Sequence, residues 1–115
     1  MKGLIFVGFL SLSLHLSAQN ISEASDTEKK IAYISVKVWE DMLVLNDEQK
    51  EKLMYLVTQY EMNKNVVFKS DKDIKLKNKE LQLLEKKHHE KFEKFLDDKQ
   101  IKTFNTQIAQ IKSGV

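Results

Sequence analysis

Apolar residues recur at intervals of three or four along most of the chain after residue 26, which is the spacing of amphipathic helices. This periodicity predicts four helices, over residues 27–43, 47–68, 71–95 and 98–113. Short polar segments between them supply Ser, Asn and Asp, the residues that favour helix starts. After residue 18 the chain contains no Pro and only Gly114, so β-turns lack their preferred residues. We therefore expect an all-α fold of about four helices.

The inward-facing positions follow from the same spacing. They are Ile31, Ile34, Val38, Met42 and Leu45 in the first helix, Leu53, Leu56, Val57, Tyr60 and Val67 in the second, and Ile101, Phe104, Ile108 and Ile111 in the fourth. The third helix has a narrower seam of Ile74, Leu81, His88 and Phe95, one residue every seven, which suits packing against another long helix. Residues 32–38 also alternate as a strand would, but no turn signal or partner strand accompanies them.

One short pattern occurs twice, as Leu45-Asn46-Asp47-Glu48-Gln49 and as Leu96-Asp97-Asp98-Lys99-Gln100. In both copies an Asn or Asp can cap the helix, and a Gln three residues later can reach back to the backbone N–H of the cap. Leu45 and Leu96 precede the caps, where a hydrophobic staple fixes the entry of the chain. Each pattern therefore predicts the start of a helix.

The two copies resemble the L-T-x-x-Q signature of the Spy/CpxP family of periplasmic proteins. Leu and Gln stand in both copies, while Asn46 and Asp97 replace Thr and can perform the same capping role. The resemblance implies a small helical chaperone that needs no ATP, built as an elongated hairpin or cradle that forms an antiparallel homodimer. Metal-sensing relatives also exist in this family.

The first residues have the pattern of a secretory signal peptide. Lys2 precedes an apolar run from Leu4 to Leu16, and Ala18 is a small residue suited to cleavage. We expect a signal peptide over 1–18, a flexible mature N-terminus over 19–26 and a single helical domain over 27–113. The expected location is the periplasm or another exported compartment. An uncleaved membrane anchor is the alternative, although the apolar run is short for a stable membrane span.

Composition excludes several classes of function. The chain has no Cys, which removes disulfides, thiol catalysis and a lipid anchor on Cys. Its 19 basic residues are all Lys and its net charge is only +2, whereas a nucleic-acid-binding protein usually has a basic excess and Arg. No nucleophile with a recognisable base, Gly-rich phosphate loop or zinc-protease helix occurs, so we expect no enzyme and no cofactor.

One cluster could bind a divalent transition metal. Glu85, His89 and Glu93 are four residues apart and share one helix face, with His88 beside them. Neighbouring lysines oppose a cation, and one helix face rarely completes a coordination shell. The alternative interpretation places His88 on the apolar seam and His89 in solvent.

The remaining hypothesis concerns partners. Most aromatic residues fit the helical stripes and are expected in the core, whereas Tyr55, Met62 and Val66 fall outside the stripe of the second helix. These three are our candidates for binding unfolded protein clients, since Met adapts to varied partners. We expect a homodimeric chaperone or envelope-stress protein without stable membrane insertion. A metal-binding protein of the same fold and a structural helical partner protein are the alternatives.

Overall fold

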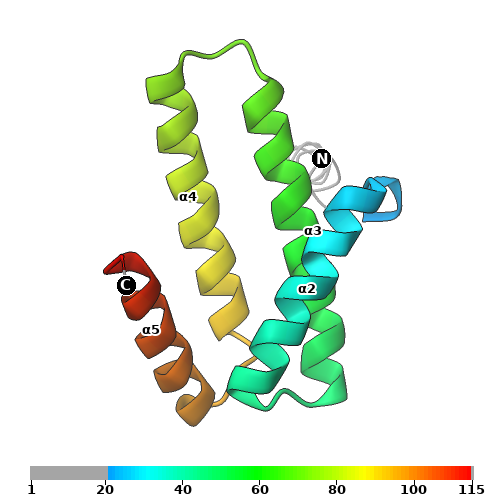
Figure 1. The fold of residues 1–115 in the computed structure, drawn as a ribbon, viewed down its shortest axis with the longest axis vertical. Coiled ribbons are helices and arrows are strands. Elements are labelled where there is room, and N and C mark those ends of the chain that lie inside the picture. The colour runs from blue at the N-terminus through cyan, green and yellow to red at the C-terminus, as the bar shows by residue number, and fades with distance from the viewer. Residues whose placement is uncertain (1–20, 115) are drawn as a thin grey trace, which may run out of the picture.

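The computed structural model describes residues 21–114 and is all-α, with no strand in that range (Figure 1). A short 3-10 helix, η1 (Ile21–Glu23), precedes four α-helices, which are α2 (Asp26–Leu43), α3 (Asp47–Lys69), α4 (Ile74–Glu93) and α5 (Asp98–Lys112). α3 and α4 form a long hairpin, α2 packs against α3, and α5 folds back from the end of α4. The predicted all-α class is confirmed, and the molecule is elongated, with a longest extent of 47 Å.

Local capping explains where the helices begin. Ser25, Asn46 and Asp97 each accept a hydrogen bond from the backbone N–H three residues later, and a Glu or Gln at that position accepts one from the cap in return. Both predicted pattern starts are therefore confirmed. The third helix is shorter than the predicted 71–95, because Asp73 caps its start and the residues after Glu93 turn away.

The core lies where all four α-helices meet above the two lower connections, and α3 contributes Leu53, Leu56 and Val57 to it. Phe92 and Phe104 are each 1% exposed and their ring centroids are 4.7 Å apart. Trp39 contacts both rings, with centroid distances of 5.8 and 5.0 Å. The ring centroids of Phe95 and Phe92 are 5.4 Å apart. Leu45 and Leu96, the residues that precede the two caps, are also buried. The expectation that most aromatic residues belong to the core is confirmed for these rings, but Tyr55 and Phe68 are exposed.

The predicted inward face of α2 is wrong. Ile31, Ile34, Val38 and Met42 are 40–55% exposed, and only Leu45 of that predicted set is buried. The face that packs against the rest of the protein is instead made of Glu28, Ala32, Val36, Trp39 and Leu43. The small Ala32 is fully buried, and its size lets the backbones of α2 and α3 approach closely. α2 therefore has a second apolar stripe, which the described residues do not cover.

The seam of α4 packs within the chain. His88 stacks on Tyr60 of α3 with ring centroids 4.4 Å apart, and Phe95 joins the core. α3 is thus the long helix that this seam was expected to meet, so the seam no longer argues for a dimer. Ile74, at the start of the seam, and Ile111, in α5, are exposed, contrary to the prediction that they face inward.

The described residues before α2, within the segment 19–26 that is expected to be flexible, contact the helical domain. η1 contacts α3, and Ala24 is buried. The carboxylate of Glu28 accepts a hydrogen bond from the side chain of Asn65, which ties the start of α2 to α3. The predicted signal peptide over 1–18 lies outside the described residues. Among residues 21–114, no helix combines the length and apolar content needed to cross a bilayer.

Candidate functional site

The two sequence patterns meet in space. The α2–α3 and α4–α5 connections lie together at the lower end of the molecule (Figure 1). The side-chain amides of Gln49 and Gln100 pair with each other, with N–O distances of 2.8 and 3.1 Å. Each glutamine still accepts from the cap of its own helix, at 3.0 Å in both cases. Together they form a joint with approximate twofold symmetry.

Each glutamine also binds the end of the helix that precedes the other copy of the pattern. Gln49 Nε2 donates to the carbonyl oxygen of Phe95 at 2.9 Å, and Gln100 Nε2 donates to that of Leu43 at 3.2 Å. Carbonyls at helix ends otherwise lack a partner within the helix. Next to Leu43, Val44 has a left-handed backbone with φ 55°, which a β-branched residue rarely adopts. The joint therefore ties the two corners of the fold together, and the α2–α3 corner contains the strained Val44.

We expect Gln49→Ala and Gln100→Ala each to destabilise the protein by about 2 kcal/mol, because each removes at least four hydrogen bonds made by the glutamine side chain. The double variant should lose about 1 kcal/mol less than the sum, since both single variants break the same pair. Urea unfolding of all four proteins measures this coupling. Gln82→Ala, at an exposed site on α4, is the control and should change little. Strict additivity would show that the two glutamines act separately.

The exposed apolar stripe of α2, made of Ile31, Ile34, Val38 and Met42, is the first surface able to bind a partner. Its residues recur at spacings of three and four, so the side chains lie in one row along the helix. Isolated exposed apolar side chains are common on soluble proteins, but a continuous row on one helix is typical of a binding surface. We call this row the α2 stripe.

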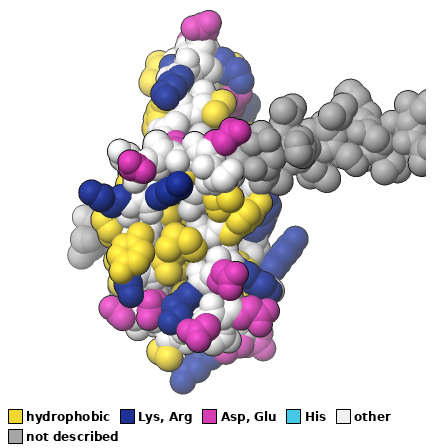
Figure 2. Space-filling model, turned by 90° about the vertical axis from the view of Figure 1, so that its right-hand side faces the viewer, with side chains coloured by type: hydrophobic (Ala, Val, Ile, Leu, Met, Phe, Trp, Pro, Cys, Tyr) yellow, Lys and Arg dark blue, Asp and Glu magenta, His cyan; other side chains and the backbone are white. Residues whose placement is uncertain are grey.

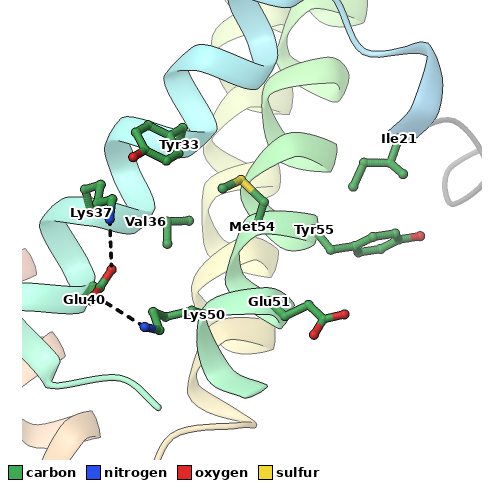
Figure 3. Close-up of a pocket in the computed structure, with 9 residues that line it drawn as sticks. All are labelled: Ile21, Tyr33, Val36, Lys37, Glu40, Lys50, Glu51, Met54 and Tyr55. Carbon is green, nitrogen blue, oxygen red and sulfur yellow. Dashed lines mark hydrogen bonds and ion pairs between the residues drawn. The ribbon is translucent and has the colours of Figure 1, made fainter. Parts of the chain in front are cut away.

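A groove of about 470 Å³ between α2 and α3 is a second surface (Figure 3). Its walls carry Tyr33 from α2 and Met54 and Tyr55 from α3, with Ile21 of η1 at one end. In the space-filling view, hydrophobic side chains gather over this face and charged ones surround them (Figure 2). The groove and the α2 stripe flank the buried face of α2 on opposite sides.

Charged residues close one end of the groove. The carboxylate of Glu40 contacts Lys37 at 3.9 Å and Lys50 at 3.5 Å, the second contact joining α2 to α3 (Figure 3). Lys50 also contacts Asp47 at 3.1 Å, and this hydrogen bond, followed by the charge of Glu40, raises the pKa of Lys50. Because these groups are exposed to water, they orient the helices and contribute little stability.

The three predicted client-binding residues lie on different surfaces. Tyr55 is exposed on the wall of the groove, as expected. Val66 is exposed near the far end of the α3–α4 hairpin, beside a small cavity that Leu83 also lines. Met62 is only half-buried and lies on neither surface. Sequence reasoning missed the α2 stripe because its residues had been assigned to the core.

The structure separates the residues of the predicted metal cluster. Glu85, His89 and Glu93 line one cavity between α4 and the end of α5, together with Lys112. His88 points to the other side, against Tyr60, as the alternative interpretation placed it. His89 is not in open solvent, because its ring packs edge-on against Phe104 at 5.3 Å. Among residues 21–114, no three His, Asp or Glu side chains are arranged to hold a metal ion.

The pKa values of His88 and His89 are both lower than that of a free histidine. Burial, followed by the positive charges of His89, Lys64 and Lys91, lowers the pKa of His88 to about 4. The Nδ1 atom of His88 is buried without a hydrogen-bond partner. Burial also lowers the pKa of His89 and raises that of Tyr60. The pair is therefore neutral at physiological pH and serves as packing between α3, α4 and α5.

Comparison with known proteins gives no significant match, whether to a family model, to a curated protein or to a solved structure.

Proposed function

We propose that the chain is an exported, ATP-independent chaperone that transiently binds unfolded proteins through the α2 stripe. The observation that carries the proposal is the exposure of Ile31, Ile34, Val38 and Met42. Unfolded chains expose apolar side chains that such a row can cover, and release follows because the buried area is small. No step in this mechanism needs a catalytic residue or a nucleotide.

Charge has a second role in the proposal. The lysines on the exposed helix faces steer acidic client segments toward the protein, after which the apolar side chains hold them. The near balance of charge in the chain, with a net charge of +2, keeps this attraction weak. Capture of an acidic client should therefore weaken when the Debye length falls from about 30 Å to about 8 Å on moving from low to physiological salt.

The decisive experiment follows the aggregation of a chemically denatured test protein by light scattering, without ATP. The parent should suppress aggregation, and Ile34→Ser should reduce this activity several-fold because it removes the most exposed side chain of the stripe. Ile111→Ser is the matched control, since Ile111 is similarly exposed but lies at the end of α5. Equal activity of the two variants, or no activity of the parent, would contradict the proposal.

The proposed homodimer can be examined with the same variants. A second copy that covers the α2 stripe would bury it, so Ile34→Ser should then lower the association measured by analytical ultracentrifugation while Ile111→Ser should not. A parent that is monomeric at tens of micromolar, roughly the range in which weak dimers form, would contradict the dimer. A stripe with one fixed partner and no general anti-aggregation activity would instead indicate a structural partner protein.

A further inference from the structure

The free end of the α3–α4 hairpin is the most basic stretch of the described chain. We call residues 64–79 the hairpin tip. The tip contains six lysines and two aspartates, a net charge of +4, whereas the whole chain carries +2. The remainder therefore carries −2. The tip lies at one end of the long axis, beyond α2 and α5 (Figure 1), so the excess positive charge of the chain is concentrated at that end.

Two of these lysines pair with glutamates just outside the tip, so residues 61–80 together carry a net charge of +2. Lys64 and Lys72 form ion pairs with Glu61 and Glu80. The positive charge of Lys69 contributes to lowering the pKa of Glu28. Lys75 and Lys79 are exposed and make no ion pair with any described residue. Lys77 donates to the carbonyl oxygen of Phe68 at 2.8 Å and keeps its charge.

The tip also exposes large apolar side chains. Val66, Phe68, Ile74 and Leu76 are 42–72% exposed. The upper end of the space-filling view carries both lysines and hydrophobic side chains (Figure 2). The backbone beneath them is well satisfied, since Ser70 hydrogen-bonds to the carbonyl of Val67 through its N–H and its hydroxyl, and Asp73 caps α4. These side chains lie in the last turns of α3 and the first turn of α4, on either side of a hydrogen-bonded loop of four residues.

We propose that the hairpin tip docks the protein on an anionic phospholipid surface. Phe68 and Ile74 would enter the boundary between headgroups and acyl chains, while the lysine stems lie along apolar surface and their ammonium groups contact lipid phosphates. The concentration of positive charge at the hairpin tip favours an end-on orientation, which leaves the α2 stripe free. The contact is peripheral and is independent of the proposed chaperone function.

The experiment uses the absence of Cys in the chain. Phe68→Cys, carrying an environment-sensitive dye, reports from the tip alone. Asn105→Cys, labelled in the same way, reports from the exposed face of α5. The full chain is mixed with vesicles of phosphatidylglycerol and phosphatidylcholine in equal parts, or of phosphatidylcholine alone. We expect a blue shift only for the tip label and only with the anionic vesicles.

Charge reversal separates the tip from every other source of membrane binding. Lys75→Glu with Lys79→Glu should weaken binding to the anionic vesicles at least tenfold. Lys99→Glu with Lys102→Glu makes the same change in charge on exposed positions of α5 and should weaken it far less. Equal binding by both double variants would overturn the proposal. It would also be overturned if the tip label responded to a denatured acidic protein but not to the anionic vesicles, which would make the tip a protein-binding surface.

Discussion

Replacing Phe92 with Ala should lower the stability of the protein by about 3–5 kcal/mol, the usual cost of deleting a buried phenyl ring. Phe92 is 1% exposed and contacts the rings of Trp39, Phe95 and Phe104, so α2, α5 and the connection after α4 lose a common partner. Small domains have a total stability of about 5–15 kcal/mol. We therefore expect the variant to be largely unfolded, or to melt at least about 15 °C below the parent.

Phe68→Ala is the matched control, because it deletes the same ring at a site that is 53% exposed. Its melting temperature should stay close to that of the parent, as for most surface substitutions. Thermal melts followed by circular dichroism compare the three proteins. If Phe92→Ala melts like Phe68→Ala, the aromatic cluster is not the centre of the fold.

The starts of α3 and α5 were predictable because they depend on local chemistry. A capping box involves four consecutive residues, so residues 46–49 and residues 97–100 each supply all the side chains that the start of the helix requires. The contact between the two boxes was not predicted, although a signal for it existed. A Glu at this position could also accept the hydrogen bond from the backbone N–H of the cap, as Glu28 does at the start of α2. Only a Gln side chain can in addition donate a hydrogen bond to another group. The choice of Gln in both boxes therefore indicates a second partner.

The orientation of α2 could not be obtained from its own sequence. Apolar residues cover more than one side of this helix, and the middle of the buried face and the middle of the α2 stripe lie roughly 115° apart around the helix axis. Either stripe satisfies helical periodicity. What decides between them is the shape of α3 and α5, because the small Ala32 allows a closer approach than Ile31 would. Tertiary packing therefore decides which face of α2 is buried. The residues predicted for the core lie on the other face and form the candidate binding surface.

Sequence spacing also correctly placed Glu85, His89 and Glu93 on one face, since residues four apart share a face in any helix. It could not show that α5 folds back and sets the ring of Phe104 against His89. That contact depends on the angle between α4 and α5, which the joint between Gln49 and Gln100 helps to fix. The environment of both histidines thus depends on tertiary packing, and we expect it to make stability depend on pH.

Stability should fall when the pH is lowered from 7 to 5, before the carboxylates begin to titrate. The pKa of His88 is about 4 in the folded protein and about 6.5 in the unfolded chain, so the unfolded chain binds the proton more readily. The resulting loss begins as the pH falls below 6.5, reaches about 2 kcal/mol at pH 5 and is complete, at about 3 kcal/mol, below pH 4. His89, whose pKa is also lowered, adds a loss of the same sign.

The groups that face His88 explain why its protonation is unfavourable. Tyr60 covers one side of the ring, while Lys64 of α3 and Lys91 of α4 bring like charge, and His89 adds to it when protonated. Glu28, whose pKa is lowered chiefly by its hydrogen bond to the backbone of Ser25, loses its contribution only as the pH falls below about 4.5, so it does not affect the range from 7 to 5. The histidines therefore account for most of the expected change in stability between pH 7 and pH 5.

Urea unfolding of the parent, His88→Phe and His89→Phe at pH 7 and pH 5 tests the assignment. Phe keeps a flat ring against Tyr60 but cannot bind a proton, so His88→Phe should lose much less stability than the parent between the two pH values. His89→Phe should retain most of the loss, because His88 is the more deeply buried of the two. If His88→Phe loses as much stability as the parent, the acid sensitivity has another origin, and His88 is accessible to water in the folded protein.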